Sequence, residues 1–294
     1  MIPIEIVFLI GMAILLFLAL KVKVNAFMAL LGTALVMGLL AGMPTTAVVN
    51  GIVTGFAGTV KSIGIVIIFG IMLGNYLEAS KATNKMALDT VKLVGEKRSG
   101  LAMAISGYIV SIPVFSDAGF VILSPLVKAI SKKAKIPLAV LAVSLSAGLL
   151  ATHVYVPPTP GPLAAAGMLG IDIGRAILYG GFAAIFMTGA GWLFAELYFR
   201  NKPESFYTYR EDAEPQPEAD MDEADLPSSL TAVFPLLVPI VLIIMNTTFN
   251  MLLPKGSPVL NVTSFIGDPN IALAIGALLA IALLGKRLGS KKVM

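Results

Sequence analysis

Long apolar segments recur along the whole chain, and they constrain its fold more than any other feature. A helix needs about 20 consecutive apolar residues to cross the ~30 Å hydrocarbon core of a bilayer. Eight segments have this length or come close to it: 2–20, 24–42, 62–79, 101–127, 136–170, 174–199, 230–250 and 270–285. The sequence therefore predicts an all-α polytopic membrane protein that is surrounded by a lipid bilayer.

Composition excludes several other classes of protein. Only 13% of the residues are charged and the mean hydropathy is +0.91, which argues against a soluble enzyme, a disordered chain or a nucleic-acid-binding protein. The chain has no cysteine and one histidine, so we expect no thiolate or imidazole metal site and no metal cofactor. A membrane-embedded enzyme would need paired intramembrane aspartates or a His-Glu-x-x-His motif, and neither is present.

The lysines and arginines indicate the orientation of the segments. If 101–127 crosses the membrane once, the two sides carry similar numbers of bases. If it enters and returns on the same side, 18 of the 21 bases lie on one side and three (Lys61, Arg175 and Lys255) on the other. Cytoplasmic loops carry the excess of positive charge. This favours a re-entrant hairpin at 101–127, an external N-terminus and a cytoplasmic segment 200–229.

Two helix breaks are predicted within apolar segments. Gly107, Pro113 and Gly119 interrupt 101–127, and two arms of about ten residues would reach ~15 Å, half of the hydrocarbon core. The alternative is one kinked helix that spans the membrane. The second break lies in 136–170, where Val156-Pro-Pro-Thr-Pro-Gly-Pro162 cannot continue a helix. Interrupted backbone at membrane depth marks the binding site of many transporters, whereas an external loop is the simpler reading of this break.

The acidic stretch near residue 200 separates two parts of the chain. Residues 201–229 hold nine of the seventeen acids and only two bases, a composition typical of a disordered linker. An odd number of crossings before this stretch inverts the orientation of the helices after it, as in an inverted repeat. We therefore predict N-terminal scaffold helices in 1–80, then a hairpin, broken helix and further helix in 81–199. The linker (200–229) and two helices of a second repeat (230–294) complete the chain.

The proline-rich decamer also carries a resemblance to a known family. His153 through Pro162 resembles the gluconate permease (GntP) signature His-x-x-Val-Pro-Pro-Thr-Pro-Gly-Pro. The stretch 112–123, beginning Ile-Pro-Val-Phe-Ser-Asp-Ala-Gly, resembles the hairpin segment of that family, and 55–80 resembles its third helix. Lys81 departs from the family pattern, in which a small residue follows Ser80. Family members also continue into a second hairpin and a second broken helix, so this chain looks C-terminally truncated.

The resemblance implies the fold of the wider ion-transporter superfamily, with an incomplete second repeat. It also implies a permease of a bacterial inner membrane that carries a small anionic carboxylate, such as gluconate or a related sugar acid, with proton symport. D-serine or another small carboxylate is an alternative substrate. Further alternatives are an ion/H⁺ antiporter of the same superfamily and a fragment that does not transport. The oligomeric state is open, with a homodimer among the options.

Helix-start chemistry indicates how such a substrate would bind. Ser116 and Asp117 are residue types that cap a second hairpin arm, and Thr159-Pro160 is a second start signal. Two helix N-termini at the same depth would bind a carboxylate. The carbonyls of Thr152, His153 and Val156, freed by the prolines, would then accept hydrogen bonds from substrate hydroxyls. The predicted substrate-binding residues are Ser116, Asp117, Gly119, Thr152, His153, Thr159 and Gly161.

Asp117 is the main candidate for coupling transport to a cation. An ionisable group at the membrane centre costs ~2.5–3.5 kcal/mol or more and is functional by default. A substrate carboxylate beside it would favour its protonated form, which is the linkage that proton symport requires. Coordination of Na⁺ and a merely capping role are the alternatives. His153 is a second candidate for proton coupling, or a packing residue.

Overall fold

The structure is a computed structural model that describes residues 3–202 and 225–288. Within these ranges all regular structure is helical, and six segments are long and apolar enough to cross a membrane: Ile4–Val22, Thr45–Ala79, Leu138–Leu169, Ile173–Phe199, Ser229–Leu252 and Pro269–Leu288. The prediction of a polytopic helical membrane protein is thus confirmed. Most of the predicted linker, 203–224, lies outside the described residues. The chain forms two compact units, Met1–Gly64 and Ile65–Met294.

The first unit begins with two helices joined by a short turn. α1 (Ile4–Leu16) continues into the π-helical segment η1 (Phe17–Val22), and α2 is Ala26–Leu40. The Asn25 side chain caps α2 by accepting a hydrogen bond from the Phe27 backbone N–H at 2.9 Å. Gly11 of α1 leaves the room that the Met37 side chain of α2 fills, so the two helices pack closely.

A long helical run comes next, and it begins earlier than the sequence predicts. α3 (Thr45–Thr59), the π-helical segment η2 (Val60–Gly64) and α4 (Ile65–Ala79) are consecutive, and together they form the candidate span Thr45–Ala79. The predicted apolar segment covers only 62–79. Thr54, Thr59 and Lys61 lower the hydropathy before this segment, but none of them breaks a helix, because their backbone groups still complete the helical hydrogen bonds.

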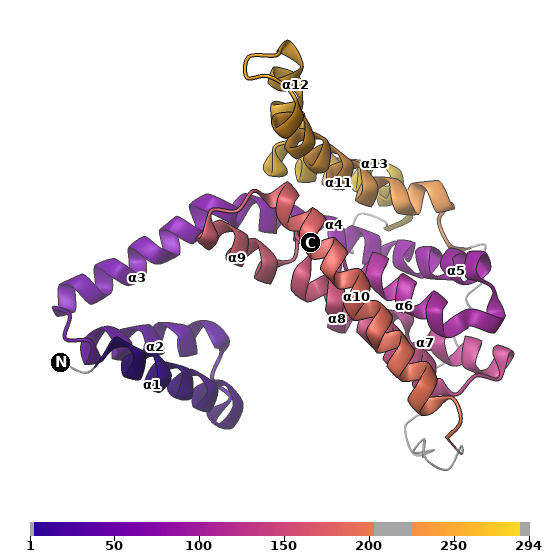
Figure 1. The fold of residues 1–294 in the computed structure, drawn as a ribbon, viewed down its shortest axis with the longest axis horizontal. Coiled ribbons are helices and arrows are strands. Elements are labelled where there is room, and N and C mark those ends of the chain that lie inside the picture. The colour runs from indigo at the N-terminus through magenta and orange to yellow at the C-terminus, as the bar shows by residue number, and fades with distance from the viewer. Residues whose placement is uncertain (1–2, 203–224, 289–294) are drawn as a thin grey trace. The chain divides into compact units, whose positions relative to one another are not determined.

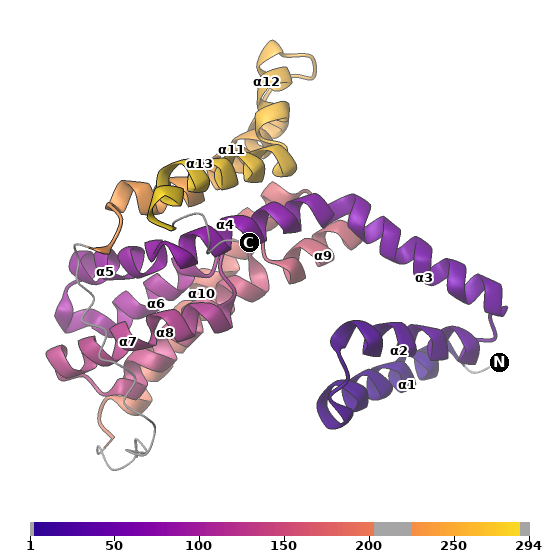
Figure 2. The same ribbon diagram turned by 180° about the vertical axis from the view of Figure 1, so that it is seen from behind.

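The second unit is built around a bundle of helices from the middle of the chain. These helices are α4, α5 (Ala82–Val94), α6 (Ser99–Val110), α7 (Ser116–Ala134), α8 (Leu138–Tyr155), α9 (Pro160–Leu169) and α10 (Ile173–Phe199), with a short 3₁₀ turn, η3 (Glu96–Arg98), between α5 and α6. α5 to α8 lie side by side, and α10 packs along α6 and α8 (Figures 1 and 2).

Close backbone approach holds α6 against α8 in this bundle. A Cβ at Gly107 would strike the backbone of α8 at Leu145 and Leu149, and one at Gly148 would strike α6 at Ala104 and Tyr108. Such small-residue contacts replace the hydrophobic driving force that a lipid environment lacks. The core around them is apolar and contains the fully buried side chains of Leu141, Leu145, Leu149 and Met103.

Three helices complete the second unit. α11 (Ser229–Leu252) and α13 (Pro269–Leu288) pack against each other, and the short α12 (Pro258–Ile266) lies between them in the chain. The Thr247 hydroxyl of α11 donates a 2.8 Å hydrogen bond to the carboxylate of Asp172, which also caps the start of α10. This bond connects the helices on the two sides of the acidic stretch. The sequence predicted α11 and α13, but not α12 or α5.

Candidate functional site

The predicted hairpin segment is two helices with a tight break between them. α6 ends at Val110 and α7 starts at Ser116, and the Ser111 hydroxyl closes the turn by donating to the Val114 carbonyl at 3.2 Å. Pro113 lacks an N–H and cannot continue α6. The arms are unequal, with 12 and 19 residues. α7 is longer than predicted because its last turns carry lysines, which hide a helix from a hydropathy count but do not end it.

The start of α7 differs in detail from the capping prediction. The residue at the N-cap position is Phe115, whose side chain cannot cap, and Ser116 and Asp117 occupy the first turn. The hydroxyl of Ser116 and the carboxylate of Asp117 make no hydrogen bond within the described part of the chain. Asp117 is therefore not a helix cap, and the first N–H groups of α7 have no side-chain partner among the described residues.

The second helix break is in the predicted place, and one side-chain hydroxyl binds the carbonyls that the break exposes. α8 ends at Tyr155, Thr159 is the N-cap residue of α9, and Pro160 is its first residue. The Thr159 hydroxyl shares its one proton between the carbonyls of His153, at 2.9 Å, and Val156, at 2.7 Å. The carbonyl of Thr152 accepts the Val156 N–H at 2.9 Å. The prediction that the prolines leave these three carbonyls free is therefore wrong, because Thr152 accepts a backbone N–H and the other two share the Thr159 hydroxyl.

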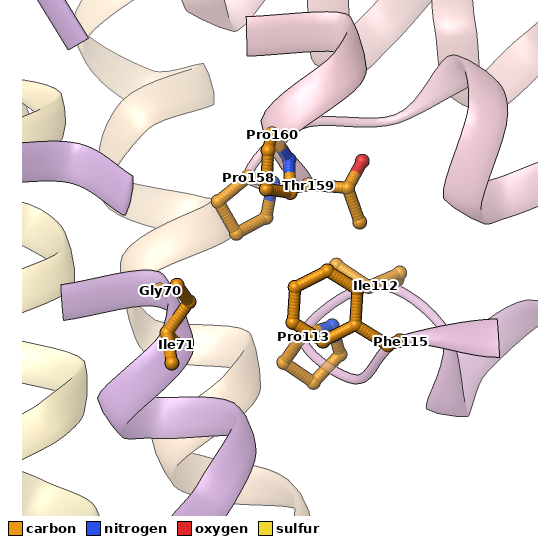
Figure 3. A pocket seen from close by; sticks show the side chains of 8 residues that line it. All are labelled: Gly70, Ile71, Ile112, Pro113, Phe115, Pro158, Thr159 and Pro160. Carbon is orange, nitrogen blue, oxygen red and sulfur yellow. The ribbon is translucent and has the colours of Figure 1, made fainter. Parts of the chain in front are cut away.

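Both helix breaks pack against the same face of α4. Gly70 lies against Pro158, where an added Cβ would sit 3.4 Å from the proline Cβ, and a Cβ at Gly74 would collide with the Pro113 carbonyl oxygen. Figure 3 shows Gly70 and Ile71 on one side of a gap, with Pro158, Thr159 and Pro160 above it and Ile112, Pro113 and Phe115 opposite. The gap has a volume of about 10 Å³, room for one water molecule.

The two breaks are also level with each other along α10. The Tyr108 hydroxyl, near the end of α6, donates to the Gly181 carbonyl at 2.9 Å, and Gly180 packs against the carbonyl of Tyr155. Gly100, at the start of α6, lies beside Glu196 near the other end of α10. α6 and α8 therefore run antiparallel to α10. The contacts of Tyr108 and Tyr155 thus lie about 12 Å from the N-terminal end of α10, at a rise of 1.5 Å per residue.

The predicted site residues divide between two places. Thr159 lines the gap, whereas Ser116 and Asp117 line a separate cavity of about 300 Å³ between α7 and α8. Gly119 packs against the Leu149 side chain. A Cβ at Gly161 would meet no described atom within 4 Å, so Gly161 touches neither site.

Thr152 and His153 lie close to the second break, and a polar side-chain atom of each lacks a hydrogen-bond partner. The Thr152 Oγ1 and the His153 Nδ1 are buried and have no hydrogen-bond partner among the described residues. The His153 ring lies 5.6 Å from the Phe115 ring across the two breaks. Asp117 also interacts electrostatically with His153. The histidine thus connects the hairpin break with the broken helix.

Several residues of this site carry no functional signal in the sequence. Gly70 and Gly74 had only the general small-residue pattern of helix packing, and no local signal shows that they face two helix breaks. Ile112, Pro113 and Phe115 lie within the predicted turn, but their role as a wall of the gap depends on tertiary contacts. Ser146, which lines the second cavity, carried no signal in the sequence.

These features define a class: a polytopic α-helical membrane protein in which two interrupted helical segments meet on one helix face. Comparison with known proteins then identifies the family. Residues 2–294 match the family described as GntP family permease, and the chain belongs to that family. The sequence resemblance is thus confirmed, and because the family consists of transport permeases, so is the prediction that the chain is not an enzyme.

Named relatives agree with this assignment. The chain is 39% identical to an uncharacterized permease of Haemophilus influenzae, over 95% of this chain and 59% of the relative. It is 34% identical to a high-affinity gluconate transporter of Escherichia coli, over 95% of this chain and 63% of the relative. A gluconate permease of Pseudomonas aeruginosa is 32% identical, over 93% and 61%. The chain therefore spans about three-fifths of the length of these relatives. No solved structure matches it.

Proposed function

We propose that the chain is the substrate-binding part of a secondary transporter for a small organic acid, such as gluconate or a related sugar acid, in a bacterial inner membrane. The single observation that carries the proposal is the meeting of the two helix breaks on the glycine face of α4. Interrupted backbone within a membrane is tolerated where it is buried in protein or lines a wet cavity. Relatives named as gluconate transporters support the class of substrate.

A re-entrant hairpin at α6–α7 is part of this proposal. α6 has 12 residues, about 18 Å of helix, which is too short for the ~30 Å core. The Tyr108 hydroxyl, near the end of α6, bonds Gly181, eight residues after the first residue of α10, which supports a turn that lies beside α10 within the membrane. The excess of bases on one side supports the external N-terminus, and α11 and α13 would open a second, inverted repeat.

Two helix N-termini at the breaks supply the chemistry for a carboxylate. α7 has no side-chain cap, and the Thr159 hydroxyl points back to carbonyls of the break instead of capping α9. The first-turn N–H groups of α7 are thus available, as is the one N–H that Pro160 and Pro162 leave at the start of α9, that of Gly161. The helix dipoles favour an anion there. The gap holds about one water in this conformation, so the acid would displace that water and widen the gap.

Asp117 and His153 are the proposed coupling groups. Asp117 has no ion pair within the described residues and lies in the electrostatic field of His153. A bound substrate carboxylate favours protonation of a nearby acid by like-charge repulsion. Loading of the anion and of a proton would then be linked, as symport requires. The proposed site keeps the seven predicted residues: Ser116, Asp117, Gly119, Thr152, His153, Thr159 and Gly161. Gly161 lines neither space and belongs to the proposal only through its N–H at the start of α9.

Counterflow of labelled gluconate into proteoliposomes tests the substrate class. The 294-residue chain should exchange labelled for unlabelled gluconate, and excess D-serine should leave the exchange unchanged. Competition by D-serine would reassign the substrate, and exchange of cations without gluconate would indicate an antiporter. Lack of exchange by this chain, with exchange by the Escherichia coli relative in the same vesicles, would show that this part does not transport alone.

A pH gradient tests the coupling. Asp117→Asn mimics the protonated acid, so it should keep counterflow but lose accumulation driven by an inward proton gradient. Glu5→Gln, which changes an acid in the first turn of α1, is the matched control and should keep both. Accumulation that survives Asp117→Asn would contradict the coupling role.

A further inference from the structure

The cavity between α7 and α8 is separate from the gap at the two breaks. It has a volume of about 300 Å³ and is lined by Ser116, Asp117, Phe120, Val121, Ser146, Leu149 and Leu150. None of these residues lines the gap. Phe115 faces the gap and Ser116, the next residue, faces the cavity, so the start of α7 separates the two spaces.

Three polar side chains open into this cavity without a partner among the described residues. Ser116 is only 8% exposed, and its hydroxyl makes no hydrogen bond within that part of the chain. The hydroxyl of Ser146, which is half-buried, and the carboxylate of Asp117, which is exposed, also make no hydrogen bond there. Within a bilayer, a carboxylate that faces lipid costs ~2.5–3.5 kcal/mol or more, and a hydroxyl that faces lipid also lacks a hydrogen-bond partner. The remaining four lining residues are apolar and satisfy none of these groups.

Water relieves these costs better than lipid does. A water molecule occupies about 30 Å³ and needs two to four polar partners. The cavity has room for several such molecules, and its three oxygen-bearing side chains provide the first hydrogen bonds. Acids within membrane segments almost always face protein or a water-filled space.

We infer that the α7–α8 cavity is a hydrated access site for a cation, through which a proton reaches Asp117, with Ser116 and Ser146 holding the water. Among the residues that the structure describes, its only charged lining group is a carboxylate, and no lysine or arginine lines it. His153 of α8 is a titratable group that interacts electrostatically with Asp117. The use of this site for coupling rests on the proposed function, whereas its hydration does not.

A proton fits this site better than a metal ion does. Four side-chain oxygens, from three side chains among four apolar ones, are few ligands for a cation that must shed its water, since hard cations bind through many oxygens. A hydrated proton needs only a chain of water and the carboxylate that accepts it. Substrate and proton would then approach the start of α7 from two different sides.

The absence of cysteine in the chain allows a direct test of hydration. Thiols react with methanethiosulfonate reagents as hydrated thiolates, so the rate reports access to water. Ser146→Cys is the test variant. Ser144→Cys is the matched control, because Ser144 lies two residues away on the same helix, is 0% exposed and does not line the cavity. Both variants of the full 294-residue chain are reconstituted in proteoliposomes and treated with membrane-impermeant reagents.

The expected result is faster modification of Ser146→Cys by about tenfold or more, because access controls thiol reactivity. The cationic reagent MTSET should react faster than the anionic MTSES, and this preference should fall about threefold or more when Asp117→Asn removes the charge. Equal rates for the two cysteine variants would overturn the hydrated site. A charge preference that Asp117→Asn leaves unchanged would overturn the role of Asp117 in it.

A replacement variant and a comparison of two salts complete the test. If Ser146→Cys does not fold, Leu150→Cys, which lines the same cavity and is 53% exposed, replaces it with the same expected result. Slower modification in sodium than in choline at fixed pH would show a bound sodium ion and overturn the assignment to a proton. None of these readouts depends on transport, so failure of gluconate exchange and failure of this inference are distinguishable.

Discussion

Alanine substitution of Gly74 and Gly70 tests whether α4 positions the two breaks. At Gly74 the new Cβ would collide with the Pro113 carbonyl oxygen and lie 3.2 Å from its carbonyl carbon. These are backbone atoms, so the turn itself would have to move. At Gly70 the new Cβ would sit 3.4 to 3.7 Å from atoms of Pro158, which is ordinary van der Waals contact. The two positions are one helical turn apart and otherwise similar.

The two substitutions should change the free energy of unfolding differently: Gly74→Ala should lower it, and Gly70→Ala should not. Replacing a glycine in a helix by alanine stabilises it by roughly 0.5–1 kcal/mol, and overpacking costs about 1–3 kcal/mol. Gly74→Ala should therefore lower the free energy of unfolding by about 1–2 kcal/mol, because overpacking exceeds the helical gain. Gly70→Ala should leave it unchanged or raise it by up to ~1 kcal/mol. The two variants would differ by about 2 kcal/mol, roughly 30-fold in the unfolding equilibrium.

Unfolding of the purified chain in mixed micelles, with increasing fractions of denaturing detergent, measures this difference. Fluorescence of Trp192, the one tryptophan, and circular dichroism report the transition. Gluconate counterflow by the same variants should fall for Gly74→Ala and persist for Gly70→Ala. A Gly74→Ala variant that is as stable as Gly70→Ala would refute the contact between α4 and the hairpin turn.

Three side-chain hydroxyl groups that form hydrogen bonds give further predictions. Thr159→Val should lower the melting temperature in detergent and reduce gluconate counterflow, at a cost of about 1–2 kcal/mol for two lost carbonyl contacts, whereas Thr159→Ser should retain both properties. Thr247→Val should cost about 1.5–3 kcal/mol, because it removes the bond to the Asp172 carboxylate, and detergent unfolding should show the loss. Tyr108→Phe should cost about 1 kcal/mol in the same assay by releasing the Gly181 carbonyl; unchanged stability in any of the three would contradict the bond concerned.

The sequence predicted those parts of the fold that have local causes. The prolines at 157, 158, 160 and 162 end α8 and start α9 because they lack N–H donors, and the Pro113 turn was visible for the same reason. α5 was missed because it is amphipathic: its lysines and Asp89 lower the hydropathy while Ala82, Met86 and Ala87 are buried. Apolar periodicity, not average hydropathy, is the signal for such a helix.

The site was less predictable, since its geometry depends on contacts between distant segments. The carbonyls of the second break were expected to be free, but the Thr159 hydroxyl reaches two of them, and a sequence does not show where a hydroxyl turns. Likewise, the division of the site residues between two spaces follows from the way in which α7 packs on α8. Asp117 was predicted from its type and depth, whereas Ser146 becomes visible only in the packed structure.

Because both helix breaks pack on α4, the spacing of their contacts has a consequence for the size of the ligand that fits between them. Pro113 rests at Gly74 and Pro158 at Gly70, so the rise of four helical residues, ~6 Å, sets the offset between them. That length suits a carboxylate and its neighbouring carbon but not an entire six-carbon acid. A gap of this length would bind the carboxylate end of a ligand, and other parts of the protein would contact the rest of the molecule.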